Sequence, residues 1–379
     1  VASQAIATMP SILLFPIFPF IVEVLLVLYF VFVSALLYSA GDLVPKFKGA
    51  SSETDVGSLL SADGSVPSGF GVASSADDSP PAVANVTRLE CATDPDCYYG
   101  VEWDNALKYM FLYHLFGLLW TNQFIVGFGY VSIAGAVANF YWNRGDVSAM
   151  PARPVTASVK RTLFYHLGSI AFGAFLVAVI QFIRFIVEVI NHKTKKMQQE
   201  NAAIKYIMRC VRCCLWCLEK IMKFINRNTY IMVAVKGTSY CRSAGRAVSL
   251  IITNALRLAA VNTVGDAVIW LAKITVTAAC GVTAFLMADL DLYTNEEKHP
   301  DTFLSSPIFP VLVSLLVGYV VADLFFGVYE MTVDTILLSF CEDCESNGGN
   351  PKFAPPLLLE AIGKSRERQE AKGKEVAET

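Results

Sequence analysis

A strongly apolar stretch from Tyr113 to Trp142 carries polar and aromatic side chains where a simple anchor would have leucine and valine. These side chains are Tyr113, His114, Trp120, Asn122 and Gln123. At membrane depth, polar groups usually face a protein interior or a water-filled path. We therefore expect this segment to be one helix of a bundle with internal polar surfaces.

Helical spacing sorts these side chains into faces. His114 points away from the aromatic face, and we expect it to be a packed, hydrogen-bonded histidine. Aromatic residues at this spacing are compatible with a helix-packing face and with the wall of a path, and Gly117 leaves space between the rings. The aromatic face, at positions i, i+3, i+4, i+7 and i+11, consists of Tyr113, Phe116, Gly117, Trp120 and Phe124.

An acidic stripe occupies a later apolar segment. Asp323, Glu330 and Asp334 follow one another at i, i+7 and i+11, on one helix face. A charged side chain at the bilayer centre costs about 2.5–3.5 kcal/mol on the lenient insertion scale, so the three should line a polar interior or pair with cations. We expect Glu330 to lie deepest, Asp334 near the cytosolic end and Asp323 in the outer half of a pathway.

Asp266 and Lys273 share one face of another apolar segment. Seven residues of helix separate them by about 10 Å, so they should have different partners. We expect both to be buried in the bundle, with Lys273 as the countercharge to Glu330 or Asp334. A structural ion pair that locks two helices explains the same residues equally well.

Composition identifies the class of protein that must position these side chains. The 379 residues are 54% hydrophobic and 17% charged, with a mean hydropathy of +0.49, whereas soluble domains are about 25% charged. The net charge of −3 gives no footprint for nucleic acid. The sequence therefore predicts an integral membrane protein.

Motifs for catalysis, nucleotides or metals are missing from the sequence. It has no phosphate-binding loop, dinucleotide fingerprint, G-x-S-x-G or H-E-x-x-H. Cys210, Cys213, Cys214 and Cys217 span too wide an arc of one helix to close a tetrahedral zinc site, which favours packing or S-acylation. We expect no enzyme activity, no cofactor and no metal.

The predicted fold is all-α, with about six transmembrane helices, since about 20 apolar residues cross a bilayer. The segment 202–235 is ambiguous because it mixes apolar residues with Lys and Arg. The other candidate spans are 12–40, 104–142, 160–191, 262–288 and 306–340. The predicted organisation is a helix at 1–40, a loop at 41–103, two long helices at 104–191, a charged, Cys-rich region at 192–261, two helices at 262–340 and a cytosolic tail at 341–379.

The loop 41–103 is rich in Ser, Gly, Pro and Asp, a composition that cannot bury a core. It contains Asn85 in an N-x-T glycosylation pattern, followed by Cys91 and Cys97, which suit a small disulfide. We expect a glycosylated lumenal or extracellular loop, although chance N-x-T patterns and free cysteines are common. With this loop outside and the tail inside, parity requires 202–235 to cross as a charged, protein-lined span, unless one neighbouring segment does not fully cross; we favour the crossing. That crossing leaves Lys193, Lys195 and Lys196 outside, against the positive-inside rule.

Five segments closely resemble the C-terminal half of choline transporter-like proteins (solute carrier family 44). They are YHLFGLLWTNQFI, KRTLFYHLGSIAFGAF, CCLWCLEKIMKFINRNTYIMVAV, NALRLAAVNTVGDAVIWLAKI and YEMTVDTILL, in the order of the family, from about residue 103 to 345. The resemblance implies ten spans with both termini cytosolic. It favours a crossing at 202–235 and an N-terminal part that precedes Val1. The loop 41–103 looks longer than is typical of the family.

Choline, or a related small organic cation, is the ligand that the resemblance implies. Its permanent charge calls for aromatic rings, worth about 0.5–2 kcal/mol each as cation–π contacts, and a nearby carboxylate. We therefore expect Tyr113, Phe116, Trp120 and Glu330 to bind the substrate. Asp266, Lys273, Asp323 and Asp334 should line the pathway or form ion pairs.

Two functions are consistent with the sequence. One is a carrier for choline or a related quaternary amine in the plasma membrane or an organelle membrane. The other is a structural subunit of a membrane assembly that keeps the fold without transport, with protein partners that the sequence does not identify. Buried charges favour the carrier, because drift on a lipid-facing surface would replace them with apolar residues.

Overall fold

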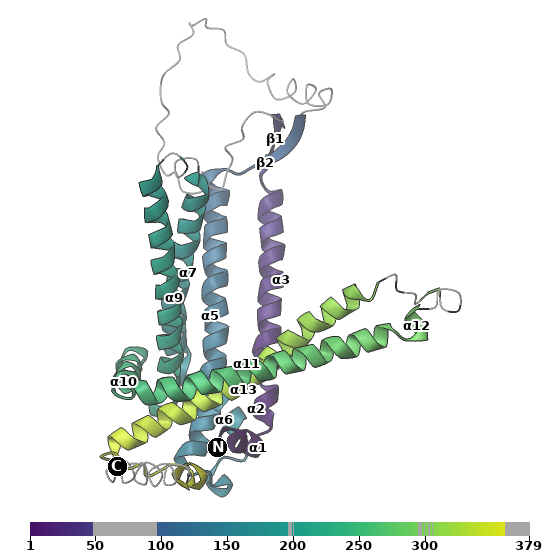
Figure 1. The fold of residues 1–379 in the computed structure, drawn as a ribbon. Helices are drawn as coiled ribbons and strands as arrows, with labels where there is room; N and C mark the ends of the chain where they lie inside the picture. The colour runs from purple at the N-terminus through teal and green to yellow at the C-terminus, as the bar shows by residue number, and fades with distance from the viewer. Residues whose placement is uncertain are drawn as a thin grey trace, which may run out of the picture. The chain divides into compact units, whose positions relative to one another are not determined.

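The structure is a computed structural model that describes residues 1–47, 97–195, 199, 201–294, 298, 300–301, 304 and 306–360. The described chain is predominantly helical (Figure 1). The short helices are α1 (Ala2–Thr8), α2 (Ser11–Leu14), α6 (Pro154–Arg161), α10 (Tyr240–Thr253) and α12 (Asp291–Thr294). The long helices are α3 (Ile17–Ser39), α5 (Asn105–Trp142), α7 (Leu167–Lys193), α9 (Ala202–Lys236), α11 (Ala255–Ala288) and α13 (Ile308–Ser346).

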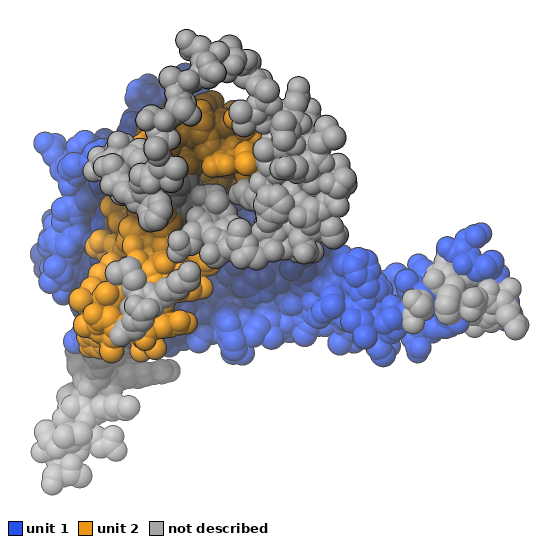
Figure 2. Space-filling view, turned by 90° about the horizontal axis from the view of Figure 1, so that it is seen from above, with its two compact units in different colours: residues 1–23, 123–177, 220–379 blue, residues 24–122, 178–219 orange. Residues whose placement is uncertain are grey.

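Two compact units divide the chain, and Figure 2 shows them in blue and orange. The first unit comprises residues 1–23, 123–177 and 220–379. The second comprises residues 24–122 and 178–219. Each of α3, α5, α7 and α9 therefore contributes one part to each unit.

The second unit contains most of α3, a strand pair, the first part of α5, the last part of α7 and the first part of α9. Strands β1 (Asp42–Phe47) and β2 (Cys97–Glu102) pair in antiparallel register. These two paired strands flank residues 48–96 in the sequence. His114 stacks on the Phe30 ring of α3 at 4.7 Å between centroids, and its Nε2 lies 3.3 Å from the Phe30 carbonyl oxygen. This confirms the prediction that His114 is a packed, hydrogen-bonded histidine.

The core of the first unit lies where the C-terminal parts of α5, α9 and α13 meet α1 and α10. Its largest fully buried side chains include Tyr141, Tyr230, Ile170, Leu250 and Met331. The turn η1 (Val147–Ala149) and the π-helical turn η2 (Thr162–His166) connect α5, α6 and α7. In the same unit, α11 and α13 run side by side (Figure 1), and the Ser314 hydroxyl donates to the Cys280 carbonyl across them at 3.1 Å.

Close packing of α7 against α9 in the first unit depends on Gly173. The Tyr230 hydroxyl of α9 donates to the Ile170 carbonyl at 3.0 Å, and Asn226 Nδ2 donates to the Gly173 carbonyl at 3.2 Å. A Cβ at Gly173 would lie 2.6 Å from the Tyr230 hydroxyl, so no larger residue fits without displacing this polar contact.

Among the described residues, five helical segments are long and apolar enough to cross a membrane: 11–39, 105–142, 154–193, 258–288 and 308–346. The charged helix α9 is not among them, although its 35 residues span about 50 Å, more than a bilayer core requires. Ion pairs compensate part of its charge, because Glu219 of α9 pairs with Arg184 of α7 at 2.5 Å in the second unit. The crossing of 202–235 stays a prediction.

Helix α13 continues to Ser346, beyond the predicted end of its span at residue 340. Its final turns bury two carboxylates whose charges have partners. Glu342 pairs with Lys236 at 2.5 Å and with Arg246 at 2.7 Å. Asp343, which is fully buried, accepts hydrogen bonds from Tyr141 Oη, Asn347 Nδ2 and the backbone N–H groups of Lys352 and Phe353.

Candidate functional site

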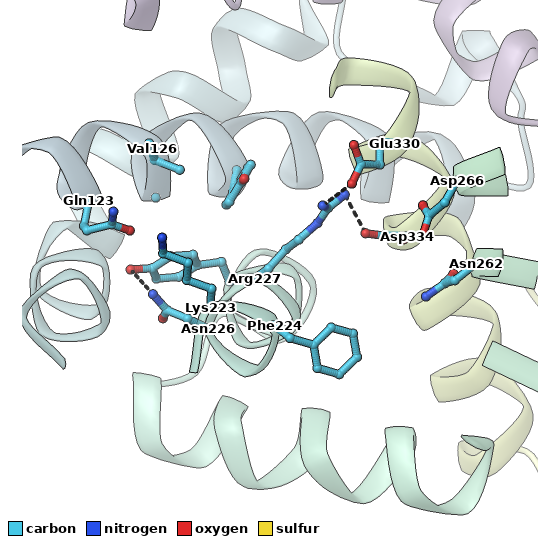
Figure 3. Close-up of a pocket in the computed structure, with 13 residues that line it drawn as sticks. Gln123, Val126, Lys223, Phe224, Asn226, Arg227, Asn262, Asp266, Glu330 and Asp334 are labelled. Carbon is cyan, nitrogen blue, oxygen red and sulfur yellow. Dashed lines mark hydrogen bonds and ion pairs between the residues drawn. The ribbon is translucent and has the colours of Figure 1, made fainter. Parts of the chain in front are cut away.

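A polar cavity of about 490 Å³ opens in the first unit. Helices α5, α9, α11 and α13 surround it, and each contributes side chains that can bind a small polar or charged molecule (Figure 3). The lining residues that carry polar groups or charge are Gln123, Tyr130, Lys223, Asn226, Arg227, Tyr230, Asn262, Asp266, Glu330 and Asp334.

Arg227 of α9 joins two carboxylates of α13 at one side of the cavity. Its Nη1 lies 2.5 Å from Glu330 Oε1 and its Nη2 lies 2.6 Å from Asp334 Oδ2. All three side chains are largely buried, with exposed fractions of 20%, 30% and 18%. Because the planar guanidinium binds both carboxylates at once, it fixes the position of α9 relative to α13 within this unit.

Tyr130 of α5 supplies an aromatic ring to the same cluster. The Arg227 guanidinium lies over this ring, 5.6 Å from its centroid, so the ring already makes a cation–π contact. An aromatic face beside carboxylates is the combination that an organic cation without hydrogen-bond donors requires. The cavity therefore contains both elements of such a site.

Asp266 of α11 is the carboxylate of the cavity for which the described residues provide no ion pair. Figure 3 shows it beside Asp334, on the side of the cavity formed by α11, with Asn262 one turn away. We expected Asp266 to be buried, but its side chain is exposed. Three lining carboxylates against Lys223 and Arg227 leave one formal negative charge in the cavity.

Lys273 pairs with Asp323 at 2.6 Å, so the prediction that it neutralises Glu330 or Asp334 is wrong. The antiparallel register of α11 and α13 explains the difference. Lys273 opposite Asp323 places Asp266, seven residues earlier on α11, opposite Glu330, seven residues later on α13. Lys273 is itself largely buried, with an exposed fraction of 15%, which agrees with the expected intramembrane ion pair.

The predicted substrate-binding residues fall in different units. Glu330 lines the cavity of the first unit, whereas Tyr113, Phe116 and Trp120 belong to the second. Phe116 packs edge-on against Phe182 at 5.5 Å and against Trp120 at 6.3 Å between centroids, while Tyr113 is 81% exposed. The structure thus groups Glu330 with Asp266 and Asp334 and describes the aromatic face separately.

Arg227 and Tyr130 are among the cavity residues that were not predicted from the sequence. Arg227 lies in the charged segment 202–235, whose mixture of charge and apolar residues was the available signal. The carboxylates of α13 require a cation, and Arg227 is the one that the fold supplies. Tyr130 lies ten residues after Trp120 on α5, where helical spacing continues the aromatic face through Gln123 and Gly127.

Other predicted features are not at the cavity. Asn85 and Cys91 lie outside the described residues, and only the backbone of Cys97, in β2, is described. Cys210, Cys213, Cys214 and Cys217 are exposed on α9. Within the described part of the chain, no group of three or more His, Cys, Asp and Glu side chains is placed to hold a metal ion.

Long apolar helices around an internal polar cavity define the class: a polytopic helical integral membrane protein. A family model described as plasma-membrane choline transporter matches residues 1–345. The chain therefore belongs to the choline transporter-like family, a family of transporters rather than of enzymes. This confirms the predicted family and membrane location.

Named relatives agree with the family match. Choline transporter protein 1 of Arabidopsis thaliana is 40% identical over 285 residues, which cover 74% of this chain and 40% of that protein. Choline transporter-like protein 2 of Xenopus laevis is 34% identical over 97% of this chain and 50% of its own length. Choline transporter-like protein 4 of Mus musculus is 32% identical over 97% of this chain and 50% of its own length. The chain spans about half the length of these relatives.

Proposed function

We propose that the protein containing this chain carries choline or a related quaternary amine across a membrane, and that the cavity of the first unit binds the cation. The observation that carries this proposal is the uncompensated carboxylate of Asp266 in a cavity that also holds the Tyr130 ring. A monovalent cation would neutralise the single excess negative charge. The names of the relatives, which refer to choline transport, agree with this chemistry.

The ion pairing of the three carboxylates suggests one role for Asp266 and another for Glu330 and Asp334. Glu330 and Asp334 both pair with Arg227, which balances one of their two negative charges and fixes the position of both side chains. Asp266 attracts the incoming cation, and Tyr130 offers its ring to the methyl groups, which carry the positive charge of a quaternary amine. Binding through one carboxylate and one ring allows release, which a carrier needs.

The aromatic face of α5 is the second proposed contact. Tyr113, Phe116 and Trp120 precede Gln123 on α5 at spacings that keep them on one helix face. We propose that these rings also contact the cation during transport. Lys273 and Asp323, which neutralise each other, serve to join α11 to α13 in this scheme.

Choline uptake by liposomes containing the purified full-length protein tests the role of Asp266. At about 4 Å, an opposite charge contributes about 1 kcal/mol in water and about 4 kcal/mol near a protein surface. The substitution Asp266→Asn removes that charge and keeps the shape. We therefore expect the choline concentration for half-maximal uptake to rise about fivefold or more.

The matched control is Asp289→Asn, at the exposed end of α11 and outside the cavity, which should leave uptake unchanged. Wild-type concentration dependence in Asp266→Asn would show that the cation binds elsewhere. A folded wild-type protein that moves neither choline nor any other quaternary amine would instead support the non-transporting structural subunit.

A further inference from the structure

A second polar cavity, of about 290 Å³, lies between α7 and α9 in the second unit. It differs from the proposed cation site in the first unit because its net charge is positive rather than negative. Arginines from both helices line it, together with one carboxylate and an aromatic side chain. The lining residues that carry charge or a ring are Arg184, Glu188, Arg209, Arg212 and Trp216.

Ion pairs balance two of the three arginines. Arg184 pairs with Glu219 at 2.5 Å, and Gln181 Nε2 also donates to Glu219, which is only 9% exposed. Arg212 pairs with Glu188 at 2.8 Å. For Arg209, the described residues provide no ion pair, and its side chain is exposed. The arginine cavity therefore has one positive charge in excess, counting both Glu188 and Glu219.

The sequence of α7 places this cavity at the edge of the membrane. From Thr162 to Ile183 the chain carries no Asp, Glu, Lys or Arg, and Arg184 ends this run. These 22 residues span about 30 Å as a helix, the thickness of the hydrocarbon core. Arg184 therefore lies at the headgroup boundary.

The other arginines lie level with that boundary or beyond it. The antiparallel contact of Arg212 with Glu188 places Arg212 one turn past Arg184 along α7. Arg209 precedes Arg212 on α9 and so lies farther from the hydrocarbon core. Trp216 is 48% exposed, and such amphipathic rings are typical of membrane–water interfaces.

We propose that the arginine cavity binds the phosphate group of a membrane phospholipid, with Arg209 as its main contact. A phosphodiester carries one negative charge and accepts two parallel hydrogen bonds from a guanidinium. It would neutralise the excess charge of the cavity at the depth where lipid phosphates lie. Arg184 and Arg212 are partly exposed, at 47% and 49%, so both can turn toward the same anion.

Lipid binding to the purified, delipidated full-length protein in a phosphate-free detergent tests this site. The probes are phosphatidylglycerol, diacylglycerol with the same acyl chains, and soluble glycerol phosphate, and the readout is bound lipid by native mass spectrometry. We expect phosphatidylglycerol to bind at least tenfold more tightly than either other probe. Equal binding of diacylglycerol would overturn the phosphate contact, and equal binding of glycerol phosphate would overturn the lipid as its source.

Substitutions locate the site. Arg209→Gln should weaken phosphatidylglycerol binding about tenfold, since a hydrogen bond to a charged group contributes about 1.5–3 kcal/mol and 1.4 kcal/mol is a factor of ten. Arg242→Gln, an exposed arginine of α10, is the matched control and should bind as wild type. Wild-type affinity in Arg209→Gln would refute the assignment.

A variant that should bind phosphatidylglycerol more tightly provides a second test, because misfolding would not increase binding. Glu188→Gln removes the carboxylate that occupies Arg212, so Arg212 becomes available to the phosphate. We expect phosphatidylglycerol to bind severalfold more tightly to this variant than to wild type. Unchanged or weaker binding by a folded Glu188→Gln protein would contradict the proposed site.

Discussion

Charges in the first unit occur in a connected group rather than as isolated pairs. Arg227 pairs with both Glu330 and Asp334, Lys273 pairs with Asp323, and Asp266 has no ion pair among the described residues. Because Arg227 is paired and Asp266 is not, substitutions at these two residues should have different consequences. Loss of Arg227 should affect folding, whereas loss of Asp266 should affect binding.

Arg227→Gln should lower the stability of the protein by about 3 kcal/mol, because it leaves two largely buried carboxylates without a cation. The triple substitution Arg227→Gln, Glu330→Gln and Asp334→Asn removes the excess charge and should recover most of that loss. Thermal unfolding of the detergent-solubilised variants measures both effects. A triple variant that is no more stable than Arg227→Gln would show that the charges are not coupled.

Trp120→Leu tests the aromatic face of α5. Leucine keeps most of the apolar volume but removes the ring, a loss of about 0.5–2 kcal/mol for a bound cation. The choline concentration for half-maximal uptake should therefore rise about two- to thirtyfold, with protein yield maintained. Trp270→Leu, an exposed tryptophan of α11, is the control. Reduced yield with unchanged affinity in Trp120→Leu would indicate that the ring only packs.

Residue types and spacing predicted the acidic stripe on α13, because three charged side chains in an apolar segment have a high free-energy cost in a bilayer unless they have polar surroundings. The same reasoning predicted the packed His114 from its position off the aromatic face. It could not assign the partners of the charges. Whether Lys273 or Arg227 meets Glu330 depends on the register between helices, which no spacing within one helix determines.

At the scale of elements, the contact of α7 with α9 depends on one small residue. Gly173→Ala should destabilise the first unit by about 1–3 kcal/mol, because its methyl group would displace Tyr230 and Tyr240. Gly168→Ala, on the same helix, meets nothing within 4 Å and should be neutral or slightly stabilising. Unfolding midpoints of the two variants, measured side by side, separate packing from helix propensity. Equal midpoints would contradict the close contact.

Long apolar segments were predictable as helices, because their length and hydropathy leave few alternatives in a membrane. Element ends were less predictable. Helix α13 continues to Ser346 because Lys236 and Arg246 neutralise Glu342 and because Asp343 finds donors in the following residues. The partners of Glu342 come from other helices, and the donors to Asp343 lie in the residues after α13, so the composition of the span itself gave no sign of them.

At the scale of the whole molecule, the crossing of α9 decides the orientation of everything that follows. If α9 crosses, Gln199 lies on the side of the loop 41–103, and Ser148 lies on the opposite side. In a protein without native cysteines, Gln199→Cys should react with a membrane-impermeant maleimide added outside intact cells. Ser148→Cys should react only after permeabilisation. The reverse pattern, or labelling of both positions in intact cells, would exclude this topology.

The hydrogen bonds to Asp343 also bear on how the chain matures during synthesis. Tyr141 is made long before Asp343, but Asn347, Lys352 and Phe353 follow it. Until those residues leave the ribosome, a carboxylate that is fully buried in the finished fold lacks most of its donors. The end of the last span therefore acquires its native environment only after the next few residues have been translated, so folding there must lag behind insertion.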